Sequence, residues 1–347
     1  MANPVRVNLG ERSYDIAIGS GLLHGLGEAC RSVVKGRRVF LVADATVDGL
    51  YGNRAAASLA AAGYEVVRAV VPAGEESKSG AHYLALLEKA AAAALDRQAC
   101  VVALGGGVVG DLAGFVAATY LRGVSFVQVP TTLLAMVDSA VGGKTGINLP
   151  QGKNLVGAFY QPALVVCDTD LLRTLSEREF AAGLAEVIKY GIIYDPDLFA
   201  SLERDLEGLE DDHAALAGII ARSCAIKAEV VGQDERESGL RAILNFGHTL
   251  GHALEKVAGY GMFLHGEAVG VGMAYAARLS ARVQGLPEDQ VQRIVDVIRR
   301  AGLPVKAPRL AWADLRRAMD VDKKSQGGQP RFVLADRIGH VAGGCGV

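Results

Sequence analysis

The first half of the chain alternates short β-branched runs with alanine-rich segments, and this alternation constrains the fold more than any other feature. The apolar runs RRVFLVAD, YEVVRAVVP and ACVVALGGG are separated by the segments NRAAASLAAAG and SGAHYLALLEKAAAAALD. Runs rich in valine favour strands, whereas alanine-rich segments of this length favour helices. A strand–helix–strand alternation is typical of a parallel sheet covered by helices, so we predict an α/β domain here.

The character of the sequence changes near residue 177. Two further apolar runs, SFVQVP and ALVVCD, extend the predicted sheet to about residue 170. After them, EREFAAGLAEVIKYGII, HAALAGIIARSCAIKAEVVGQ and EDQVQRIVDVIRRAG show helical periodicity and few strand signals. A chain of 347 residues also exceeds the size at which a single core usually stops growing. We therefore predict an α/β domain at residues 1–177 and a mostly helical domain at 178–347.

Charge and cysteine usage exclude several classes of protein. The formal net charge is -2, and no block of like charge offers a surface for nucleic acid or for a membrane. The five cysteines are scattered and form no C-x-x-C pair, which indicates reduced thiols. The N-terminus lacks the apolar core of a signal peptide, and the charge-free stretch GVSFVQVPTTLLAMV is shorter than the roughly 20 residues of a membrane helix. We predict a cytoplasmic protein.

A glycine-rich turn follows the predicted strand ACVVAL. Gly105, Gly107 and Gly110 match G-x-G-x-x-G before the helical segment DLAGFVAATYL. Free N–H groups at a helix N-terminus suit a diphosphate, but a tight turn that needs glycine only for steric reasons would read the same. No acidic residue lies about 20 residues further on to bind a ribose, so Asp44, at the end of RRVFLVAD, is the alternative.

Several charged residues stand in apolar or glycine-rich surroundings. Glu186 and Lys189 lie in the apolar segment AGLAEVIKYGII, where an unpaired charge is costly. They form an i, i+3 pair, or Glu186 faces a metal. The stretch DSAVGGKTGINLPQGKNLVGAF is too irregular for a regular element, and its lysines, Lys144 and Lys153, are either phosphate ligands or solvated loop residues.

Three of the seven histidines, His248, His252 and His265, lie close together in the sequence. If residues 245–255 are helical, His248 and His252 share one stripe with Asn245 and Glu255. The H-x-x-x-H spacing is similar to that of zinc peptidases, but no glutamate stands between the histidines to act as a base. Packing roles are the alternative. The spacing favours a metal bound by His248 and His252, with His265 or a carboxylate as the third ligand.

The motifs GGGVVGD, YLRGV, VPTTLLAMVDSAVGGKTGINLPQGKN, LAEVIKYG, LNFGHTLGHALE, HGEAVGVGM and DKK together resemble the 3-dehydroquinate synthase family over about residues 40–335. The resemblance implies an N-terminal Rossmann-like domain, a helical C-terminal domain and an active site in the cleft between them. It also implies a homodimer with NAD and one divalent metal, zinc or cobalt, as cofactors. The small-molecule substrate would be a sugar acid phosphate, 3-deoxy-D-arabino-heptulosonate 7-phosphate (DAHP).

The reaction implied by the resemblance yields 3-dehydroquinate and phosphate in the shikimate pathway. It proceeds by transient oxidation by NAD, β-elimination of phosphate, re-reduction, ring opening and an intramolecular aldol step.

The resemblance also implies the residues of the site. The implied metal ligands are Glu186, His248 and His265, a set that differs from the pair His248 and His252 that spacing favours. The implied catalytic residues are Asp138, Lys144, Lys189, Lys227, Asn245 and His252. The implied substrate-binding residues are Arg122, which belongs to the neighbouring subunit, and Asn154, Arg241 and Lys324. The implied NAD-binding residues are Asp44, Glu75, Lys78, Gly106, Gly107, Val108, Asp111, Thr131, Thr132, Lys153 and Thr174.

Three other classes of protein share the scaffold. Other sugar phosphate cyclases act on substrates without a carboxylate, but Arg241, Asn245 and His252 match the pattern for the acid. We hypothesise that Arg241 and Lys227 bind this carboxylate. Metal-dependent dehydrogenases of the glycerol dehydrogenase type release no phosphate, so the cluster of cations disfavours them. A non-catalytic NAD-sensing protein would bind the nucleotide without turnover, and the metal ligands disfavour it.

Overall fold

The structure is a computed structural model that describes residues 4–237, 239–259, 261–320 and 330–346, the last five of these by their backbone only. The chain forms two compact units. Unit 1 comprises Met1–Thr174 and Leu216–Gly232, and unit 2 comprises Leu175–Ala215 and Gln233–Val347. This division differs from the expected one in Leu216–Gly232, which packs with the first unit although it lies after residue 177.

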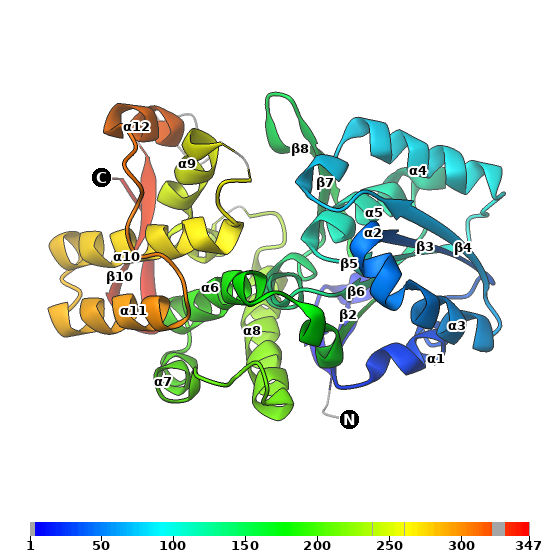
Figure 1. The fold of residues 1–347 in the computed structure, drawn as a ribbon, viewed down its shortest axis with the longest axis horizontal. Coiled ribbons are helices and arrows are strands. Elements are labelled where there is room, and N and C mark those ends of the chain that lie inside the picture. The colour runs from blue at the N-terminus through cyan, green and yellow to red at the C-terminus, as the bar shows by residue number, and fades with distance from the viewer. Residues whose placement is uncertain (1–3, 238, 260, 321–329, 347) are drawn as a thin grey trace. The chain divides into compact units, whose positions relative to one another are not determined.

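Unit 1 is built on a seven-stranded sheet of order β1-β2-β9-β6-β5-β3-β4. Figure 1 labels its strands β2, β3, β4, β5 and β6. Strands β1 and β2 pair antiparallel, and all other neighbours in this sheet pair parallel. The strands are β1 (Val5–Val7), β2 (Tyr14–Gly19), β3 (Arg38–Asp44), β4 (Glu65–Val71), β5 (Cys100–Gly105), β6 (Ser125–Pro130) and β9 (Leu164–Asp168). The predicted parallel sheet is therefore confirmed.

Strand β3 shows why the sequence of this sheet consists of continuous apolar runs. Leu41 and Ala43 pack in one core cluster with residues of α1 and α3, and Phe40 and Val42 pack in a second cluster with residues of α4 and α5. Successive side chains of a strand point to opposite faces, so a strand covered on both faces has no polar alternation. The covering helices are α1 (Leu26–Arg31), α3 (Asn53–Ala61), α4 (Gly80–Ala92) and α5 (Gly107–Thr119).

The glycine-rich stretch after β6 is regular, so our prediction of an irregular segment is wrong. Strands β7 (Lys144–Leu149) and β8 (Gly152–Phe159) form an antiparallel hairpin in which Gly146 pairs with Gly157. A Cβ atom at Gly157 would lie 2.1 Å from the carbonyl oxygen of Thr145. Glycine thus lets the two strands approach closely, and it hides the strand signal because glycine is depleted from most strands.

Unit 2 is mostly helical, as predicted. Its helices are α6 (Glu177–Ile193), α7 (Pro196–Asp205), η8 (Leu240–Asn245), α9 (His248–Ala258), α10 (His265–Val283), α11 (Glu288–Arg300) and α12 (Trp312–Asp320). The long helix α8 (His213–Gln233) begins in unit 2 and continues in unit 1. A hairpin of β10 (Arg331–Arg337) and β11 (His340–Gly346), which the sequence did not indicate to us, pairs antiparallel in unit 2.

Residues 245–255 do not form one helix. The short helix η8 ends at Asn245, and α9 begins only at His248. Between them Gly247 has φ +81°, in the left-handed region that favours glycine. The predicted stripe therefore keeps His248, His252 and Glu255, all on α9, but it was wrong for Asn245.

Two glycines of the HGEAVGVGM motif bring helix α10 against its neighbours. A Cβ atom at Gly266 would lie 1.9 Å from the carbonyl oxygen of Ala182 in α6. A Cβ atom at Gly272 would lie 1.9 Å from the carbonyl oxygen of Gly247, just before α9. Since no other residue fits at these distances, the motif fixes the N-terminus of α10 close to both α6 and the start of α9.

The cysteines that the structure describes are buried and free. Cys30, Cys100, Cys167 and Cys224 form no disulfide, and burial raises the pKa of the Cys30 thiol to about 12. A thiol with such a pKa carries almost no thiolate near neutral pH and is inert. Within the described part of the chain, no helix is long and apolar enough to span a membrane.

Candidate active site

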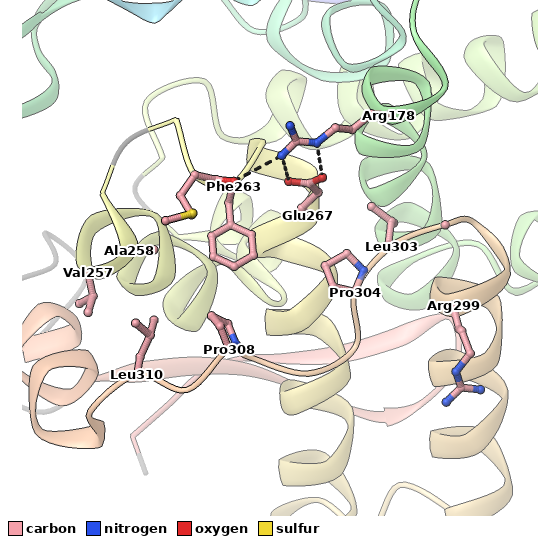
Figure 2. A pocket seen from close by; sticks show the side chains of 12 residues that line it. Arg178, Val257, Ala258, Phe263, Glu267, Arg299, Leu303, Pro304, Pro308 and Leu310 are labelled. Carbon is pink, nitrogen blue, oxygen red and sulfur yellow. Dashed lines mark hydrogen bonds and ion pairs between the residues drawn. The ribbon is translucent and has the colours of Figure 1, made fainter.

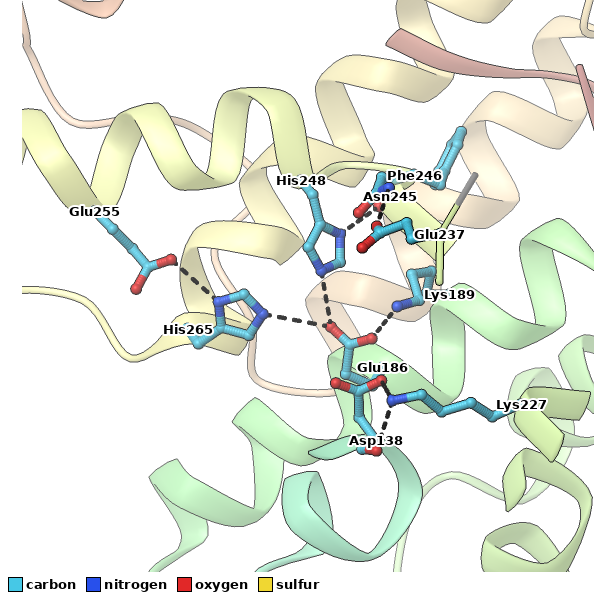
Figure 3. A network of polar contacts seen from close by, with 10 residues as sticks. All are labelled: Asp138, Glu186, Lys189, Lys227, Glu237, Asn245, Phe246, His248, Glu255 and His265. Atoms are coloured by element: carbon cyan, nitrogen blue, oxygen red, sulfur yellow. Dashed lines mark hydrogen bonds and ion pairs between the residues drawn. The ribbon is translucent and has the colours of Figure 1, made fainter. Parts of the chain in front are cut away.

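Three predicted metal ligands of unit 2 converge on one point (Figure 3). The Oε1 atom of Glu186 lies 3.6 Å from Nε2 of His248 and 3.7 Å from Nε2 of His265. Glu186 comes from α6, His248 begins α9 and His265 begins α10, so the close packing of these helices assembles the group. Two imidazoles and one carboxylate are the donor set of many catalytic zinc sites. The chemistry of the cluster therefore fits a divalent metal.

Both imidazoles are oriented through their other ring nitrogen. The Nδ1 atom of His248 lies 3.2 Å from the carbonyl oxygen of Phe246, and Nδ1 of His265 lies 3.1 Å from Oε2 of Glu255. An acceptor at Nδ1 holds the proton there and leaves the Nε2 lone pair for a metal. Glu255 is buried, and we gave it no role from the sequence, although it follows His252 by three residues on α9.

Glu186 and Lys189 form an ion pair that is almost completely removed from solvent. The ammonium of Lys189 donates to Oε2 of Glu186, and the two side chains are 1 % and 0 % exposed. The predicted i, i+3 pair is therefore confirmed, and the other oxygen of Glu186 faces the two histidines. Such burial is costly for each ion unless its partner remains in place.

The structure does not support a metal held by the pair His248 and His252. Among the described residues, a second group of three possible ligands exists, but it consists of His252, Glu255 and His265. The ring centroids of His248 and His252 are 5.4 Å apart with their planes nearly perpendicular. No three-ligand group within the described residues contains both histidines.

We expect metal binding to release a proton from His265. Burial lowers the pKa of this histidine. Hydrogen bonds to Glu186 and Glu255 outweigh burial, so that the pKa of His265 in the metal-free protein rises from 6.5 to about 10. The proton stabilises the metal-free fold fully below pH 6.5, and this stabilisation is lost as pH rises toward 10. Between these values the apparent affinity for zinc should rise about tenfold per pH unit, measured by competition with a chelating dye. A pH-independent affinity across this window would contradict the prediction.

Two further predicted residues of unit 2 are held by local hydrogen bonds. Arg241 is 2 % exposed, and its Nη1 donates to the carbonyl oxygen of Glu235 at 2.6 Å. Asn245 donates through Nδ2 to Oε1 of Glu237 at 3.4 Å. A third predicted residue, Lys324, lies outside the described residues. The substrate roles of Arg241, Asn245, His252 and Lys324 therefore stay predictions.

An apolar pocket of unit 2 lies beside Glu267, in the first turn of α10 (Figure 2). Its walls include Phe263, Leu303 and Pro304, and Arg178 and Glu267 form a bidentate ion pair at its edge, with distances of 2.7 and 2.8 Å. None of the predicted site residues in the described part of the chain lines this pocket. This pocket is therefore not the candidate active site, because Glu186, His248 and His265 do not line it.

In unit 1, the predicted NAD-binding residues gather at one edge of the sheet. Nearly all of them follow the carboxyl ends of neighbouring parallel strands, where ligands of open α/β sheets bind. Asp44 ends β3; Glu75 and Lys78 follow β4; Gly106, Gly107, Val108 and Asp111 follow β5; Thr131 and Thr132 follow β6; Thr174 follows β9. Lys153 differs, because it lies on β8 of the hairpin.

Strand order reverses between β3 and β5, and the glycine-rich turn lies at this point. A Cβ atom at Gly105 would lie 2.7 Å from Val109, and one at Gly110 would lie 2.8 Å from Oε1 of Gln128. The steric explanation therefore holds for these two glycines. It is weaker at Gly106, the N-cap residue of α5, where a Cβ atom would lie 3.2 Å from Thr132 and no side chain caps the helix. The N–H groups of this helix end can therefore meet an anion.

The side chains around this edge combine a buried ion pair with an unsatisfied hydroxyl. Lys78 is buried and pairs with Asp111, whose pKa is raised by burial although Lys78 opposes the shift. The buried Oγ1 of Thr131 has no hydrogen-bond partner among the described residues. Asp44 accepts at Oδ1 from the N–H groups of Thr46 and Val47, at 2.9 and 3.0 Å. A dinucleotide with its hydroxyls and phosphates fits this set of donors and acceptors.

The predicted substrate residues of unit 1 include a second ion pair, in which Lys227 is buried and Asp138 is partly exposed. The Nζ atom of Lys227, on α8, donates to both the carbonyl oxygen and Oδ1 of Asp138 at 2.6 Å. The hairpin carries Lys144, which is exposed, and Asn154, which has φ +54°. Arg122 follows α5 and also has positive φ, +69°. The structure brings Lys227 and Asp138 together, and it places Arg122, Lys144 and Asn154 on turns or on the hairpin.

These features define an enzyme class in which a Rossmann-like domain is combined with a helical domain that carries two histidines and one carboxylate able to hold a metal. Residues 68–182 match the family model of the 3-dehydroquinate synthase N-terminal domain, and residues 183–325 match that of the C-terminal domain. A 3-dehydroquinate synthase of Geobacter metallireducens is 53 % identical over 334 residues, which cover 96 % of this chain and 93 % of that protein. The chain belongs to the 3-dehydroquinate synthase family.

Two solved structures of sugar phosphate cyclases have the same fold over nearly the whole chain. One is the 2-epi-5-epi-valiolone synthase of Streptomyces hygroscopicus with bound NAD+ and Zn2+, which is 32 % identical with a TM-score of 0.87 and covers 97 % of this chain and 93 % of its own. The other is a 2-deoxy-scyllo-inosose synthase complexed with carbaglucose-6-phosphate, NAD+ and Co2+, at 29 % identity, a TM-score of 0.88 and coverages of 98 % and 94 %.

Proposed function

We propose that the protein converts DAHP to 3-dehydroquinate and inorganic phosphate, as a carbon–oxygen lyase of aromatic amino acid biosynthesis. The cluster of Glu186, His248 and His265 carries this proposal, because it occurs in a chain that is 53 % identical to a 3-dehydroquinate synthase. The substrate is a small sugar acid phosphate. We also propose that the enzyme works in the cytoplasm.

The cofactors of this reaction are NAD and one divalent metal, zinc or cobalt. The two similar cyclase structures hold NAD+ together with Zn2+ or Co2+. In this chain Glu186, His248 and His265 would hold the metal, and the edge of the sheet in unit 1 would hold NAD. When bound, the metal supplies Lewis acidity at a substrate hydroxyl, and NAD accepts and later returns a hydride.

The side chains of the protein bind the two charged ends of the substrate and position it. Lys144 and Asn154 would stabilise the departing phosphate together with Lys324 and Arg122, which we assign to the partner subunit. Arg241 and Lys227 would bind the carboxylate. Lys227 is already held in place by Asp138, so its ammonium is preorganised and loses little freedom when the substrate arrives.

Release of phosphate from DAHP tests this function directly. We expect release only when both NAD+ and zinc or cobalt are present, with NAD+ required in catalytic amounts and not consumed. Incubation with a chelator should abolish release, and added metal should restore it. Stoichiometric accumulation of NADH with a simple polyol would instead identify a dehydrogenase, and nucleotide binding without any release would identify a sensor protein.

A different cyclase activity is the second candidate, since the structural relatives above are named for other products. The identity to the dehydroquinate synthase, 53 %, exceeds the 32 % and 29 % to these two cyclases. The buried Arg241 also suits an acid substrate. Phosphate release from a six-carbon sugar phosphate that exceeds release from DAHP would favour this alternative.

We propose a homodimer that forms through the hairpin β7–β8. Leu155 and Phe159 of β8 are 42 % and 45 % exposed, and exposed apolar patches often mark protein interfaces. We expect Phe159→Asp to shift the protein from dimer to monomer in light scattering after size-exclusion chromatography. Leu84→Asp, at an exposed position of α4, is the matched control and should stay dimeric. An unchanged dimer in the Phe159 variant would exclude this interface.

A further inference from the structure

One residue of unit 1 that the sequence did not single out contacts three residues that we assign to ligand binding. Asn148 lies on β7, half-buried. Its Nδ2 donates to Oε1 of Glu75 at 2.7 Å, and its Oδ1 accepts from the backbone N–H of Asn154 at 2.9 Å. Its own backbone N–H donates to the carbonyl oxygen of Lys78 at 2.8 Å. Glu75 and Lys78 belong to the proposed NAD site, and Asn154 belongs to the proposed phosphate site.

The amide of Asn148 satisfies both side-chain contacts because it carries a donor and an acceptor on separate atoms. Glu75 presents a carboxylate and requires a donor, whereas the N–H of Asn154 requires an acceptor. The bond to Asn154 also supports a backbone at φ +54°, a left-handed conformation that asparagine tolerates better than most residues. The backbone contacts of residue 148 with Lys78 and Ser79 do not depend on the side chain. A substitution at 148 therefore disconnects two side-chain bonds without removing the hairpin.

We infer that Asn148 is a positioning residue that couples NAD binding to phosphate binding. Nucleotide that fixes Glu75 and Lys78 also fixes the amide of Asn148, and this amide orders Asn154 for the anion. Such coupling is reciprocal, so phosphate must tighten NAD+ binding by the same factor. This inference rests on the proposed function, since it takes the roles of Glu75, Lys78 and Asn154 from it.

The test measures binding of NAD+ to the metal-loaded enzyme by calorimetry, with and without saturating inorganic phosphate. We expect phosphate to tighten NAD+ binding in the wild type by about 5-fold or more, within the usual range of coupling. Asn148→Ala should reduce this factor to about 1 and weaken NAD+ binding about tenfold, as expected for the loss of a hydrogen bond to a charged group. Asn148→Asp keeps the acceptor for Asn154 but places a second carboxylate beside Glu75, so it should weaken NAD+ binding more than alanine does.

Asn53 supplies the matched control, because its amide oxygen accepts from Arg68 at 2.7 Å on an exposed helix of the same unit. Asn53→Ala should leave both the affinity and the coupling factor unchanged. Circular dichroism and the melting temperature check that each variant is folded. A wild-type coupling factor of 1, or an unchanged factor in folded Asn148→Ala, overturns the inference while phosphate release from DAHP still stands. Absence of NAD+ binding in the wild type overturns the proposed function itself.

Discussion

Replacing His248 with alanine is expected to remove the bound metal and to lower turnover of DAHP by about a thousandfold. His248 directs Nε2 toward Oε1 of Glu186, together with His265. A metal acting as a Lewis acid contributes several kcal/mol to catalysis, and each 1.4 kcal/mol corresponds to a factor of ten in rate. The measurements are the zinc content after dialysis and the visible spectrum of the cobalt-substituted protein, alongside phosphate release.

His252→Ala should give the opposite combination, with one metal retained and turnover lost. His252 stands four residues after His248 on the same helix, but it is not part of the group that contains Glu186. His340→Ala, at an exposed position on β11, is the control that should change neither quantity. Equal loss of metal from the His248 and His252 variants would instead support a metal bound by both histidines, as the spacing alone suggested. A second equivalent of metal lost only from His252→Ala would instead place an ion among His252, Glu255 and His265.

The three candidate metal ligands illustrate which part of a site can be predicted from sequence. The resemblance to a family identified the three residues Glu186, His248 and His265, and the structure brings their side chains together. Spacing alone favoured His248 and His252, because an i, i+4 pair on a helix is visible in the sequence. A ligand supplied by the first residue of another helix is not visible in this way. The contact depends on Gly266, whose missing Cβ allows α10 to reach α6.

Residues that act through another residue were the hardest to predict. Glu255 and Asn148 have no sequence signature of their own, since a carboxylate on a helix or an amide on a strand is usually a solvated side chain. Their roles follow from partners that are distant in the chain, His265 for Glu255 and Glu75 for Asn148. The hairpin that carries Asn148 was itself missed, because its paired glycines, Gly146 and Gly157, lower the strand signal where they make the strands fit.

The sheet of unit 1, in contrast, followed directly from the sequence. Its central strands are buried on both faces and therefore appear as uninterrupted apolar runs between helical segments. Two of the predicted NAD-binding residues lie where the strand order reverses, since Asp44 ends β3 and Gly106 directly follows β5. The sequence could not decide which glycines of the turn serve packing. Gly105 and Gly110 leave no room for a Cβ atom beside Val109 and Gln128, whereas Gly106 is the N-cap residue of α5 and supplies no side-chain cap.

Lys189→Met is expected to destabilise the metal-free protein by about 3–5 kcal/mol, because it leaves the buried carboxylate of Glu186 without its lysine. The metal-loaded protein should lose less, since the ion supplies positive charge at the other oxygen of the same carboxylate. The free energy of metal-linked stabilisation should therefore be larger in this variant than in the wild type. Thermal and urea unfolding with and without zinc measure both quantities, and Lys306→Met, at an exposed position of unit 2, is the control.

Glu186→Gln should respond to zinc in the opposite way. This variant separates the two functions of the carboxylate, which are pairing with Lys189 and binding the metal. It leaves the ammonium of Lys189 buried beside a neutral amide and removes one charged metal ligand, so added zinc cannot restore stability. Metal should thus stabilise the lysine variant strongly and the glutamate variant hardly at all. Equal stabilisation of both variants by zinc would mean that Glu186 is not a ligand and that its pairing with Lys189 is purely structural. The different responses follow because one carboxylate faces a fixed cation on one side and an exchangeable cation on the other.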